Sequence, residues 1–473
     1  MARRILLVLG AIILALALTP AAGAAPVTVP VGAVFTDTSG AAVHAHGGGV
    51  LKVGSYYYWF GENRNADSTF RYVSVYRSTD LRTWEFRRNV LTQNSHSELR
   101  VANIERPKVV YNASTGQYVM WMHKENGRDY GEARAAVAVS STVDGDYTYL
   151  RSFRPLNHMS RDITLFQDTN GTAYMISAAN ENADLHVYRL TSDYTGIAAQ
   201  VQRLWPGSWR EAPAMFKRGS VYFLLTSGAT GWAPNQQKYS TASSVEGSWS
   251  ALQNIGDGTA YGSQTAYVLP VQGSSGTSYL YLGDRWAGAW GGPVNDSRYV
   301  WLPLQFPSAT TMSMSNAASL TVDTAAGTLT ASGSGFERLN VRHSGKCVDV
   351  RDGSTADNGV VIQYTCNGGT NQQWAVRDIG GGYAQIVARH SGRCLDVASA
   401  STADGANVIQ YACGTGTNQQ WRVQATSDGY VTLAARHSGK CLDLPSAGTA
   451  DNIQFKQYPC TNGQHQQFRR TAL

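Results

Sequence analysis

Five polar side chains recur in the first two thirds of the chain at positions where they could do acid–base chemistry. Each opens a segment made of an apolar run, a turn containing glycine and a second apolar run; the five are His46, Glu105, Asp162, Glu211 and Gln264. Successive members are 59, 57, 49 and 53 residues apart. Repeats of this length are typical of propeller blades, whose innermost strands bring their first residues to one central axis. The spacing therefore predicts one shared site with three carboxyl groups, and a pair of carboxyl groups is what hydrolysis of a glycosidic bond needs.

The elements that must position these residues are predicted to be β-strands. Between residues 27 and 330, runs of Val, Ile, Tyr and Phe alternate with turns rich in Gly, Asn and Asp, and no long helical periodicity occurs. Five units of this size favour an all-β fold with a five-bladed β-propeller over a sandwich or two separate β-domains. We expect residues 301–330 to return and close the ring, and residues 331–335 to form a short linker.

The first 24 residues (1–24) are expected to be a secretory signal peptide. Arg3 and Arg4 precede an apolar run over residues 5–18, and Ala22-Gly23-Ala24 offers a cleavage site of the A-x-A type. The alternative is a membrane anchor, but this apolar run is short for a bilayer-spanning helix. The mature protein is therefore predicted to be secreted and extracellular, with no membrane association.

Charge and composition favour a carbohydrate partner over a polyanion. The formal net charge of +6 falls to +4 without Arg3 and Arg4, and the basic residues are scattered, so no nucleic-acid partner is expected. Charged residues make up only 15% of the chain, whereas Trp and Tyr number 12 and 25. Aromatic rings stack on the apolar faces of sugars. We expect a monomer that acts on a polysaccharide and needs no cofactor.

All six cysteines lie in three tandem repeats of 47 residues in the last third of the chain. The two cysteines of each repeat are 19 residues apart: Cys347 and Cys366, Cys394 and Cys413, Cys441 and Cys460. No C-x-x-C spacing indicates a metal site, so three local disulfides are expected in a secreted chain. Three short β-rich units cannot each form a core, but together they can close a three-fold barrel over residues 336–473.

The C-x-D opening and the Q-x-W ending of these repeats closely resemble the ricin-B-like β-trefoil of carbohydrate-binding module family 13. The resemblance implies up to three sugar pockets, in which a carboxylate accepts from sugar hydroxyls and an aromatic ring covers the apolar sugar face. The residues are Asp349, Tyr364 and Asn371 in the first repeat, Asp396, Tyr411 and Asn418 in the second, and Asp443 and Tyr458 in the third. In the third repeat His465 replaces the Asn and Phe468 replaces the Trp. The Gln and Trp of Q-x-W and the His of R-H-S-G are expected to be structural.

The preceding region resembles glycoside hydrolase family 43, and more closely its exo-β-1,3-galactanase branch. The runs that carry this resemblance are AHGGGVLKVGSYYYWFGENR, NIERPKVVYN, SRDITLFQD and WREAPAMFKR. The resemblance implies that Glu211 is the general acid and that Asp162 raises its pKa and orients it. The alternative for either residue is a structural pairing with a neighbouring arginine.

The group that activates the attacking water is harder to assign. Most of the family has an Asp in the first blade as general base, but this chain has an H-G-G run there and no carboxyl residue between residues 37 and 62. In the galactanase branch a fifth-blade glutamine, matched here by Gln264, is proposed to act as base through its imidic acid tautomer, while the residue matched by Glu105 binds sugar. Alternatively, Gln264 only positions the water, and Glu105 or another group takes the proton.

Further candidates lie near the ends of the predicted strands. Those for substrate binding are Glu62, Arg106, Asn182, Thr230 and Trp232. His44 and His46 could ligate a metal near the axis, but a structural, hydrogen-bonded role is favoured because no ligand cluster is visible, and no metal is predicted.

Together these features predict an inverting exo-β-1,3-galactanase that releases galactose from arabinogalactan backbones while its trefoil holds the polysaccharide. One alternative is another family 43 activity, α-L-arabinofuranosidase or β-xylosidase, which the missing first-blade Asp disfavours. The other is a non-catalytic galactan-binding lectin. Retention of both Glu211 and Asp162 disfavours that reading, because a pure binder has little need of a paired acid and modulator.

Overall fold

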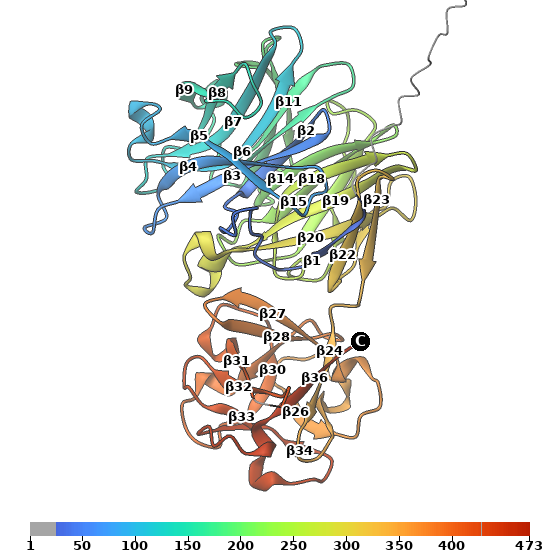
Figure 1. Cartoon of the computed structure of the whole chain (residues 1–473). Coiled ribbons are helices and arrows are strands. Elements are labelled where there is room, and N and C mark those ends of the chain that lie inside the picture. The colour runs from blue at the N-terminus through green and yellow to red at the C-terminus, as the bar shows by residue number, and fades with distance from the viewer. Residues whose placement is uncertain (1–24, 427) are drawn as a thin grey trace, which may run out of the picture.

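The structure is a computed structural model that describes residues 25–426 and 428–473; the predicted signal peptide lies outside the described residues. Figure 1 shows two lobes built from strands, the second coloured orange to red. Within the described residues, no helix has the length and apolar character needed to cross a membrane.

The first lobe contains five four-stranded antiparallel sheets, each formed by strands consecutive in the chain. Their strands are β2 (His46–Val53), β3 (Tyr56–Arg64), β4 (Phe70–Ser78) and β5 (Glu85–Thr92); β6 (Asn103–Asn112), β7 (Gln117–Glu125), β8 (Arg134–Ser140) and β9 (Thr148–Phe153); β10 (Ile163–Gln167), β11 (Ala173–Ala179), β12 (Asp184–Leu190) and β13 (Ile197–Leu204); β14 (Arg210–Arg218), β15 (Val221–Gly228), β16 (Gln237–Ala242) and β17 (Gln253–Ile255); β18 (Gln264–Gly273), β19 (Gly276–Arg285), β20 (Arg298–Gln305) and β21 (Ser313–Met314).

The first strands of the five sheets form a closed ring. β2 contacts β6, β6 contacts β10, β10 contacts β14, β14 contacts β18, and β18 returns to β2. Because each sheet packs against a neighbour on both faces, its central strands are buried on both sides and carry continuous apolar runs. Between the second and third sheets, for example, Trp121 and Tyr188 are fully buried in one cluster. Burying an aromatic side chain of this size contributes about 2–3 kcal/mol.

A separate three-stranded sheet joins the start of the chain to the end of this lobe. It consists of β1 (Val27–Pro30), β22 (Ser319–Asp323) and β23 (Thr328–Ser332), in the order β1-β22-β23. The segment that we expected to close the ring is therefore divided. Its beginning belongs to β20 and β21 of the fifth sheet, and its end packs with β1 against a core shared by the first and fifth sheets.

The second lobe is one sheet that all its strands join, wound around a core to which the three repeats contribute equivalent residues. The strands are β24 (Glu337–Val341), β25 (Cys347–Val350), β26 (Gly359–Tyr364), β27 (Trp374–Gly380), β28 (Tyr383–Ala388), β29 (Cys394–Val397), β30 (Val408–Tyr411), β31 (Trp421–Ala425), β32 (Val431–Ala435), β33 (Cys441–Asp443), β34 (Ile453–Gln454), β35 (Lys456–Tyr458) and β36 (Phe468–Ala472). The core includes Trp374, Trp421 and Phe468, which end the three repeats.

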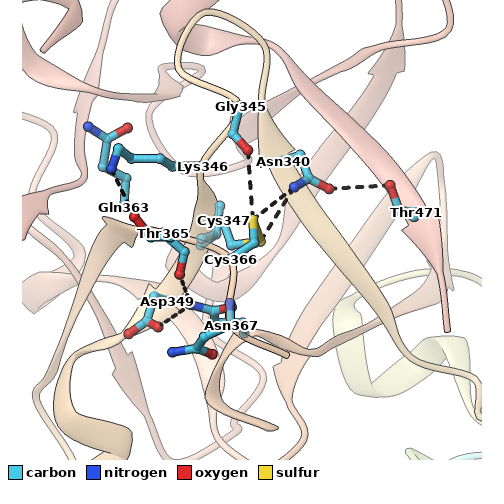
Figure 2. Close-up of a disulfide and its surroundings, with 12 residues drawn as sticks. Asn340, Gly345, Lys346, Cys347, Asp349, Gln363, Thr365, Cys366, Asn367 and Thr471 are labelled. Carbon is cyan, nitrogen blue, oxygen red and sulfur yellow. Dashed lines mark hydrogen bonds between the residues drawn. A yellow bond between two sulfur atoms is a disulfide. The ribbon is translucent and has the colours of Figure 1, made fainter. Parts of the chain in front are cut away.

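The three expected disulfides form, one in each repeat, at the 19-residue spacing seen in the sequence. They join Cys347 to Cys366, Cys394 to Cys413 and Cys441 to Cys460. Figure 2 shows the first, where the Asn340 amide donates toward both sulfurs and its oxygen accepts from Thr471. Because β24 carries Asn340 and β36 carries Thr471, this contact ties the first repeat to the end of the chain.

The described residues form no helix other than short 3-10 turns. These are η1 (Ser97–Leu99), η2 (Pro155–Asn157), η3 (Ala287–Trp290), η4 (Val294–Asp296), η5 (Arg351–Gly353), η6 (Thr370–Gln372), η7 (Ala398–Ala400), η8 (Thr417–Gln419), η9 (Pro445–Ala447) and η10 (Gln464–Gln466).

Candidate active site

Four of the five ring strands have the same irregularity next to their opening residue. The register with the following strand shifts between His46 and Gly49, Glu105 and Lys108, Glu211 and Ala214, and Thr265 and Tyr267. In three of them the residue after the opening is left-handed: φ is 61° at Gly47, 52° at Arg106 and 51° at Ala212. Bulges re-aim side chains, and left-handed residues other than glycine are strained and concentrate at functional sites. A common backbone feature thus sets where the opening residues point.

The H-G-G run, which lacks a carboxyl residue of its own, makes room for one from the next strand. A Cβ atom on Gly47 would lie 2.3 Å from Oε1 of Glu62, and one on Gly48 would lie 1.6 Å from the carbonyl oxygen of Phe60. Only glycine fits at these two positions. The carboxylate at this corner of the site is therefore that of Glu62 on β3, directly opposite His46 in the register of β2 and β3.

A cavity of about 410 Å³ opens where the ring strands begin. It brings together eight of the residues predicted from the sequence: Glu62, Glu105, Arg106, Asp162, Asn182, Glu211, Trp232 and Gln264. Thr230 is not part of its lining; the Thr230 hydroxyl donates to the carbonyl oxygen of Ala233 and accepts from Asn235 within its own loop. His46 is also outside the lining.

Glu211 is buried, and its side-chain hydrogen bonds come from two amides. Its Oε1 accepts from Nε2 of Gln264 at 2.9 Å, and its Oε2 accepts from Nδ2 of Asn182 at 3.1 Å. Burial raises the pKa of Glu211 to about 8, and the charge of nearby Asp162 adds to this shift. A carboxyl group with such a pKa carries its proton near neutral pH, as a general acid must.

Asp162 is positioned by two donors beside Glu211. Its Oδ1 lies 2.9 Å from Nε of Arg106, and its Oδ2 accepts at 3.0 Å from the backbone N–H of Ala212, the residue after Glu211. The arginine pairing considered from the sequence is thus present, and it occurs together with the contact to the Glu211 strand. The Asp162 carboxylate therefore fixes the local backbone of Glu211 and acts on it through space.

Gln264 uses all four hydrogen-bonding positions of its amide. Its Oε1 accepts from Nη2 of Arg106 at 2.6 Å and from Nε1 of Trp286 at 2.8 Å. Its Nε2 donates to Oε1 of Glu211 and to the hydroxyl of Ser227, at 2.9 and 3.0 Å. Guanidinium and indole N–H groups only donate, so they fix which end of the amide is oxygen.

Glu105 is held ionised by three donors. Its carboxylate accepts from Nη2 of Arg64 at 2.9 Å and from the Tyr130 hydroxyl at 2.6 Å, and it lies 3.1 Å from Nδ1 of His123. Burial alone would raise its pKa, but the Arg64 charge and the two side-chain hydrogen bonds more than reverse this, and the pKa of Glu105 lies well below its usual range.

Two neighbours of Glu105 have shifted pKa values of their own. His123 lies between Glu105 and Glu125, and although burial opposes its charged form, hydrogen bonds to these carboxylates raise the pKa of His123 to about 9. Glu62 shares Arg64 with Glu105. Burial raises the pKa of Glu62, and the charge of Glu105 acts in the same direction.

A buried lysine lies beside this network. Nζ of Lys108 donates to the carbonyl oxygen of Gly47 at 2.6 Å, and the side chain lines a second cavity of about 270 Å³ along with residues of all five ring strands. Burial and the charge of Arg106 lower the pKa of Lys108 to about 7.

His46 has the structural surroundings favoured from the sequence. Its Nδ1 lies 2.9 Å from Oδ1 of Asp284, and its ring stacks on Tyr299 with centroids 4.5 Å apart. Asp284 also accepts from the backbone N–H of Gly47 at 2.8 Å.

Among the described residues, Glu105, His123 and Asp162 place one potential metal-ligand atom each within 4.8 Å of one another. Glu105 is already paired with Arg64, and Asp162 with Arg106. A guanidinium group beside each of the two carboxylates disfavours a further cation there, so this donor set does not suit a resident metal.

Three tryptophans line the cavity. Trp209 is 53% exposed. Its backbone is left-handed, with φ of 52°, as is that of Trp205, with φ of 48°. Trp232 packs on Trp286, with ring centroids 5.2 Å apart, and the Arg64 guanidinium lies 5.4 Å from the Trp232 ring. Exposed indole beside a carboxylate-lined cavity is suited to stacking on a sugar ring.

Seven polar or aromatic residues that line the cavity were not predicted from the sequence, and none of them is the opening residue of a repeat. They are Arg64, His123, Tyr130, Arg161, Glu181, Trp209 and Trp286. A signal for one existed, because β6 and β7 form a hairpin in which Glu105 pairs with His123. The others lie at strand ends or in loops, with no repeated pattern to mark them.

In the second lobe each predicted Asp is held by neutral amides. Oδ2 of Asp349 accepts from Asn371 and Gln372 at 3.0 and 2.8 Å, and the second repeat has equivalent bonds from Asn418 and Gln419 to Asp396. Burial raises the pKa of Asp349 to about 6. The Gln of each Q-x-W or Q-x-F ending is structural, as expected, and it also donates to the predicted Asp of its repeat.

The third repeat departs from this arrangement. Gln466 donates to Oδ2 of Asp443 at 2.7 Å, but Nε2 of His465, in place of an Asn, lies 3.3 Å from the same oxygen. The aromatic residues also differ in exposure, since Tyr411 is 42% exposed and Tyr364 and Tyr458 are partly buried.

A buried, proton-carrying carboxyl group next to a second carboxylate, in a cavity lined by tryptophans, defines a hydrolase that acts on carbohydrate. The comparisons with known proteins agree. Residues 45–259 match the model of glycosyl hydrolases family 43, and residues 335–471 match the ricin-type beta-trefoil lectin domain. The chain belongs to glycosyl hydrolase family 43.

Several solved structures are similar over most of the chain. The exo-β-1,3-galactanase of Clostridium thermocellum is 49% identical over 94% of this chain and 100% of its own, with a TM-score of 0.64. The exo-β-1,3-galactanase of Phanerochaete chrysosporium, in complex with β-1,3-galactotriose, is 29% identical over 94% of this chain and 93% of its own, also with a TM-score of 0.64. The comparison with curated proteins gave no match.

A third similar structure matches a smaller share of this chain. It is a putative exo-β-1,3-galactanase of Bifidobacterium bifidum, 31% identical over 61% of this chain and 96% of its own, with a TM-score of 0.57.

Proposed function

We propose that this chain is a secreted, inverting exo-β-1,3-galactanase that removes galactose from β-1,3-galactan backbones, with a five-bladed propeller over residues 27–330 as its catalytic domain. The observation that carries the proposal is the buried Glu211, whose pKa of about 8 keeps it protonated in a cavity that also holds Asp162 and Gln264. The 49% identity to the Clostridium thermocellum enzyme over that enzyme's whole length supports the same substrate.

Glu211 donates its proton to the leaving glycosidic oxygen. Its neighbour Asn182 supports this role, because Oδ1 of Asn182 is buried and has no hydrogen-bond partner among the described residues. If the Asn182 amide is turned over, this oxygen faces Oε2 of Glu211 and accepts a hydrogen bond from the protonated carboxyl group, which holds the acid in one orientation before substrate arrives.

Gln264 orients Glu211 in the resting enzyme. In an imidic acid its oxygen would bear a hydrogen that faces Arg106 and Trp286, two groups that cannot accept it. The four hydrogen bonds therefore favour the ordinary amide, and with it the alternative in which Gln264 positions groups rather than taking the proton of water.

Inversion is supported by the state of the remaining carboxylates in the cavity. Retention requires a free carboxylate nucleophile about 5–5.5 Å from the acid. Glu62, Glu105 and Asp162 are each paired with an arginine, which reduces their nucleophilicity. Glu105, ionised at any working pH, is suited to accept hydrogen bonds from sugar hydroxyls.

The trefoil over residues 336–473 is proposed to hold the polysaccharide. The linker expected over residues 331–335 is shortened to residues 333–335, because residues 331 and 332 belong to β23. The amide-bound Asp349 and Asp396 offer acceptors beside Tyr364 and Tyr411 and are the preferred pockets. Local attachment raises the substrate concentration at the cavity.

The test is sugar release from three polysaccharides: β-1,3-galactan, arabinoxylan and arabinan. We expect galactose from the first and nothing from the others. Release of xylose or arabinose would identify another activity of the family, and binding of galactan without release would identify a lectin.

A further inference from the structure

The second lobe contacts two segments of the first lobe, one just before Gln264 and one just after its hydrogen-bond partner Trp286. One contact is with residues 257–263, which lead into β18, and the other is with η3, which directly follows Trp286. In Figure 1 the yellow segment after β19 extends toward β27 of the second lobe, and η3 contacts this strand.

The first contact is an ion pair that also organises a loop. Nη2 of Arg377 on β27 lies 2.6 Å from Oδ2 of Asp257, and its Nη1 donates to the Thr259 hydroxyl at 3.0 Å. Oδ1 of the same Asp257 accepts from the backbone N–H groups of Thr259 and Tyr261, at 2.9 and 2.7 Å. Asp257 thus shapes the loop with one oxygen and binds the second lobe with the other.

A second arginine fastens the same loop from the first lobe. Arg285, the last residue of β19, is 5% exposed and donates to the carbonyl oxygens of Tyr261, Gly262 and Asp378, at 2.9, 3.2 and 2.9 Å. Its guanidinium therefore connects the loop that precedes Gln264 with β27. Gly262, with φ of 74°, passes close to this guanidinium.

The contact at η3 is apolar. Ala289 and Trp290 pack with Ile379 of the second lobe, and Trp232 of the catalytic cavity lies against this cluster. Arg436 donates to the carbonyl oxygen of Trp290 at 2.9 Å. Four residues before Trp290, the indole of Trp286 donates to Gln264.

Arg377 and Ile379 are particular to the first repeat, whereas Arg436 has equivalents in the other two repeats, Arg342 and Arg389. Counting one repeat of 47 residues onward, Arg377 and Ile379 correspond to Gln424 and Thr426. Gln424 is exposed and lies in the equivalent strand, β31. The second repeat forms its strands without the arginine and the isoleucine, so these side chains are not needed to build the trefoil.

We propose that the first trefoil repeat is a positioning element of the catalytic site, in which Arg377 holds residues 257–263 and β27 holds η3, so that Gln264 keeps its bonds to Glu211, Arg106 and Trp286. This role is separate from sugar binding by the trefoil, and it rests on the proposed function. Arg377 is a positioning residue and does not touch substrate.

The test uses the full chain with β-1,3-galactobiose, a substrate short enough that attachment to polysaccharide plays no part. In Arg377→Ala we expect kcat to fall about tenfold or more while KM changes less, since small misplacements of catalytic groups carry large rate losses. The bond from Gln264 lowers the pKa of Glu211. Its loosening should therefore move the alkaline limb of the pH–rate profile to higher pH.

Two further variants separate positioning from general destabilisation. Arg377→Lys keeps a positive charge facing Asp257 and should recover most of the activity. Gln424→Ala, at the same position of the second repeat, should match the wild type. If Arg377→Ala does not fold, Asp257→Asn takes its place, with the same loss of kcat and shift of the alkaline limb expected.

An unchanged kcat and pH profile in Arg377→Ala, with only a lower melting temperature, would overturn the inference and leave the contact purely structural. If the wild type releases no galactose from galactobiose, the proposed function fails, and this inference fails with it. A loss of kcat in the variant beside an active wild type supports both.

Discussion

The two lobes are both built from internal repeats, but most repeats of the first lobe share a backbone feature and those of the second share side chains. Four of the five ring strands keep a backbone feature, a register shift beside the opening residue, while the opening side chain varies among His46, Glu105, Asp162, Glu211 and Gln264. The trefoil repeats keep the side chains, an Asp held by Gln and, in two of three, by Asn. Binding the same sugar three times needs repetition, whereas catalysis needs unlike groups converging on one bond.

The carboxyl groups of the two lobes show what this difference does to acid strength. Burial raises the pKa of both Glu211 and Asp349, to about 8 and about 6. Glu211 also has Asp162 close by, and Arg106 links Asp162 to Gln264, so its titration depends on its neighbours. Asp349 is bonded only to neutral amides at its Oδ2. After burial, the charge of Asp162 is the largest influence on the pKa of Glu211, whereas the charges of Asp352 and Asp451 affect the pKa of Asp349 less than burial and its two amide hydrogen bonds do.

The largest effect is expected from Glu211→Gln, which removes the transferable proton and keeps the shape of the side chain. The value of kcat on β-1,3-galactan should fall by about 10³-fold or more, since general acid catalysis and the associated charge stabilisation are both lost. Binding of the variant to insoluble galactan should equal that of the wild type. Activity within tenfold of the wild type would remove Glu211 from the role of acid.

The next effect tests the dependence of one ring carboxyl group on another. Asp162→Asn removes a negative charge that raises the pKa of Glu211. The acid should then lose its proton at lower pH, and the alkaline limb of kcat/KM should move from near pH 8 toward neutrality, with a loss of about 10²-fold at the optimum. An alkaline limb that stays in place would mean that the two carboxyl groups do not interact.

A smaller effect, confined to binding, is expected in the trefoil. Asp349→Asn and Asp396→Asn should each weaken binding to insoluble β-1,3-galactan, about tenfold when combined, because two of several attachment points are lost. Asp443→Asn should matter less, since His465 replaces the Asn of the other pockets. Sedimentation with the polysaccharide measures both. Equal losses from all three substitutions would contradict the distinction drawn between the repeats.

The smallest effect concerns stability against pH. The pKa values of His123 and Glu211 are raised in the folded protein, to about 9 and about 8, from ordinary values of 6.5 and 4.5. At these two sites the folded state therefore binds more protons than the unfolded chain, and their contribution to the free energy of unfolding falls as pH rises. Lys108, whose pKa is lowered to about 7, offsets part of this loss because it binds fewer protons in the folded state. The expected loss between pH 6 and 9 is on the order of 1–3 kcal/mol.

Chemical denaturation of the wild type and of Glu211→Gln at several pH values checks this. The variant lacks the contribution of the buried carboxyl group and should lose less stability toward alkaline pH. Parallel curves for the two proteins would show that Glu211 is not the source.

The sequence predicted those parts of the molecule that repeat. Spacing alone located Glu211, Asp162 and Gln264 in one cavity and assigned the disulfide pairs, because regular strands and repeats place equivalent residues equivalently. It could not locate Arg64, which bonds to Glu62 and Glu105, or Trp286, which bonds to Gln264, because neither residue opens a repeat. Thr230 was expected at the cavity, but its hydroxyl is used within its own loop.

The only sign of the contact between the lobes in the sequence is a departure from the repeat pattern. Arg377 and Ile379 stand where the second repeat has Gln424 and Thr426, and this irregularity marks the docked face. What it docks against depends on how two separately folded lobes meet, which no local periodicity records.

The role of Glu211 as the proton donor is tested most directly by changing how much the leaving group needs that proton. Glu211→Ala should be compared with the wild type on β-1,3-galactobiose and on 2,4-dinitrophenyl β-galactoside, whose leaving group departs without protonation. We predict that kcat/KM falls by about 10³-fold or more on galactobiose and by less than about tenfold on the aryl galactoside. An equal loss on both substrates would contradict the assignment of Glu211 as general acid.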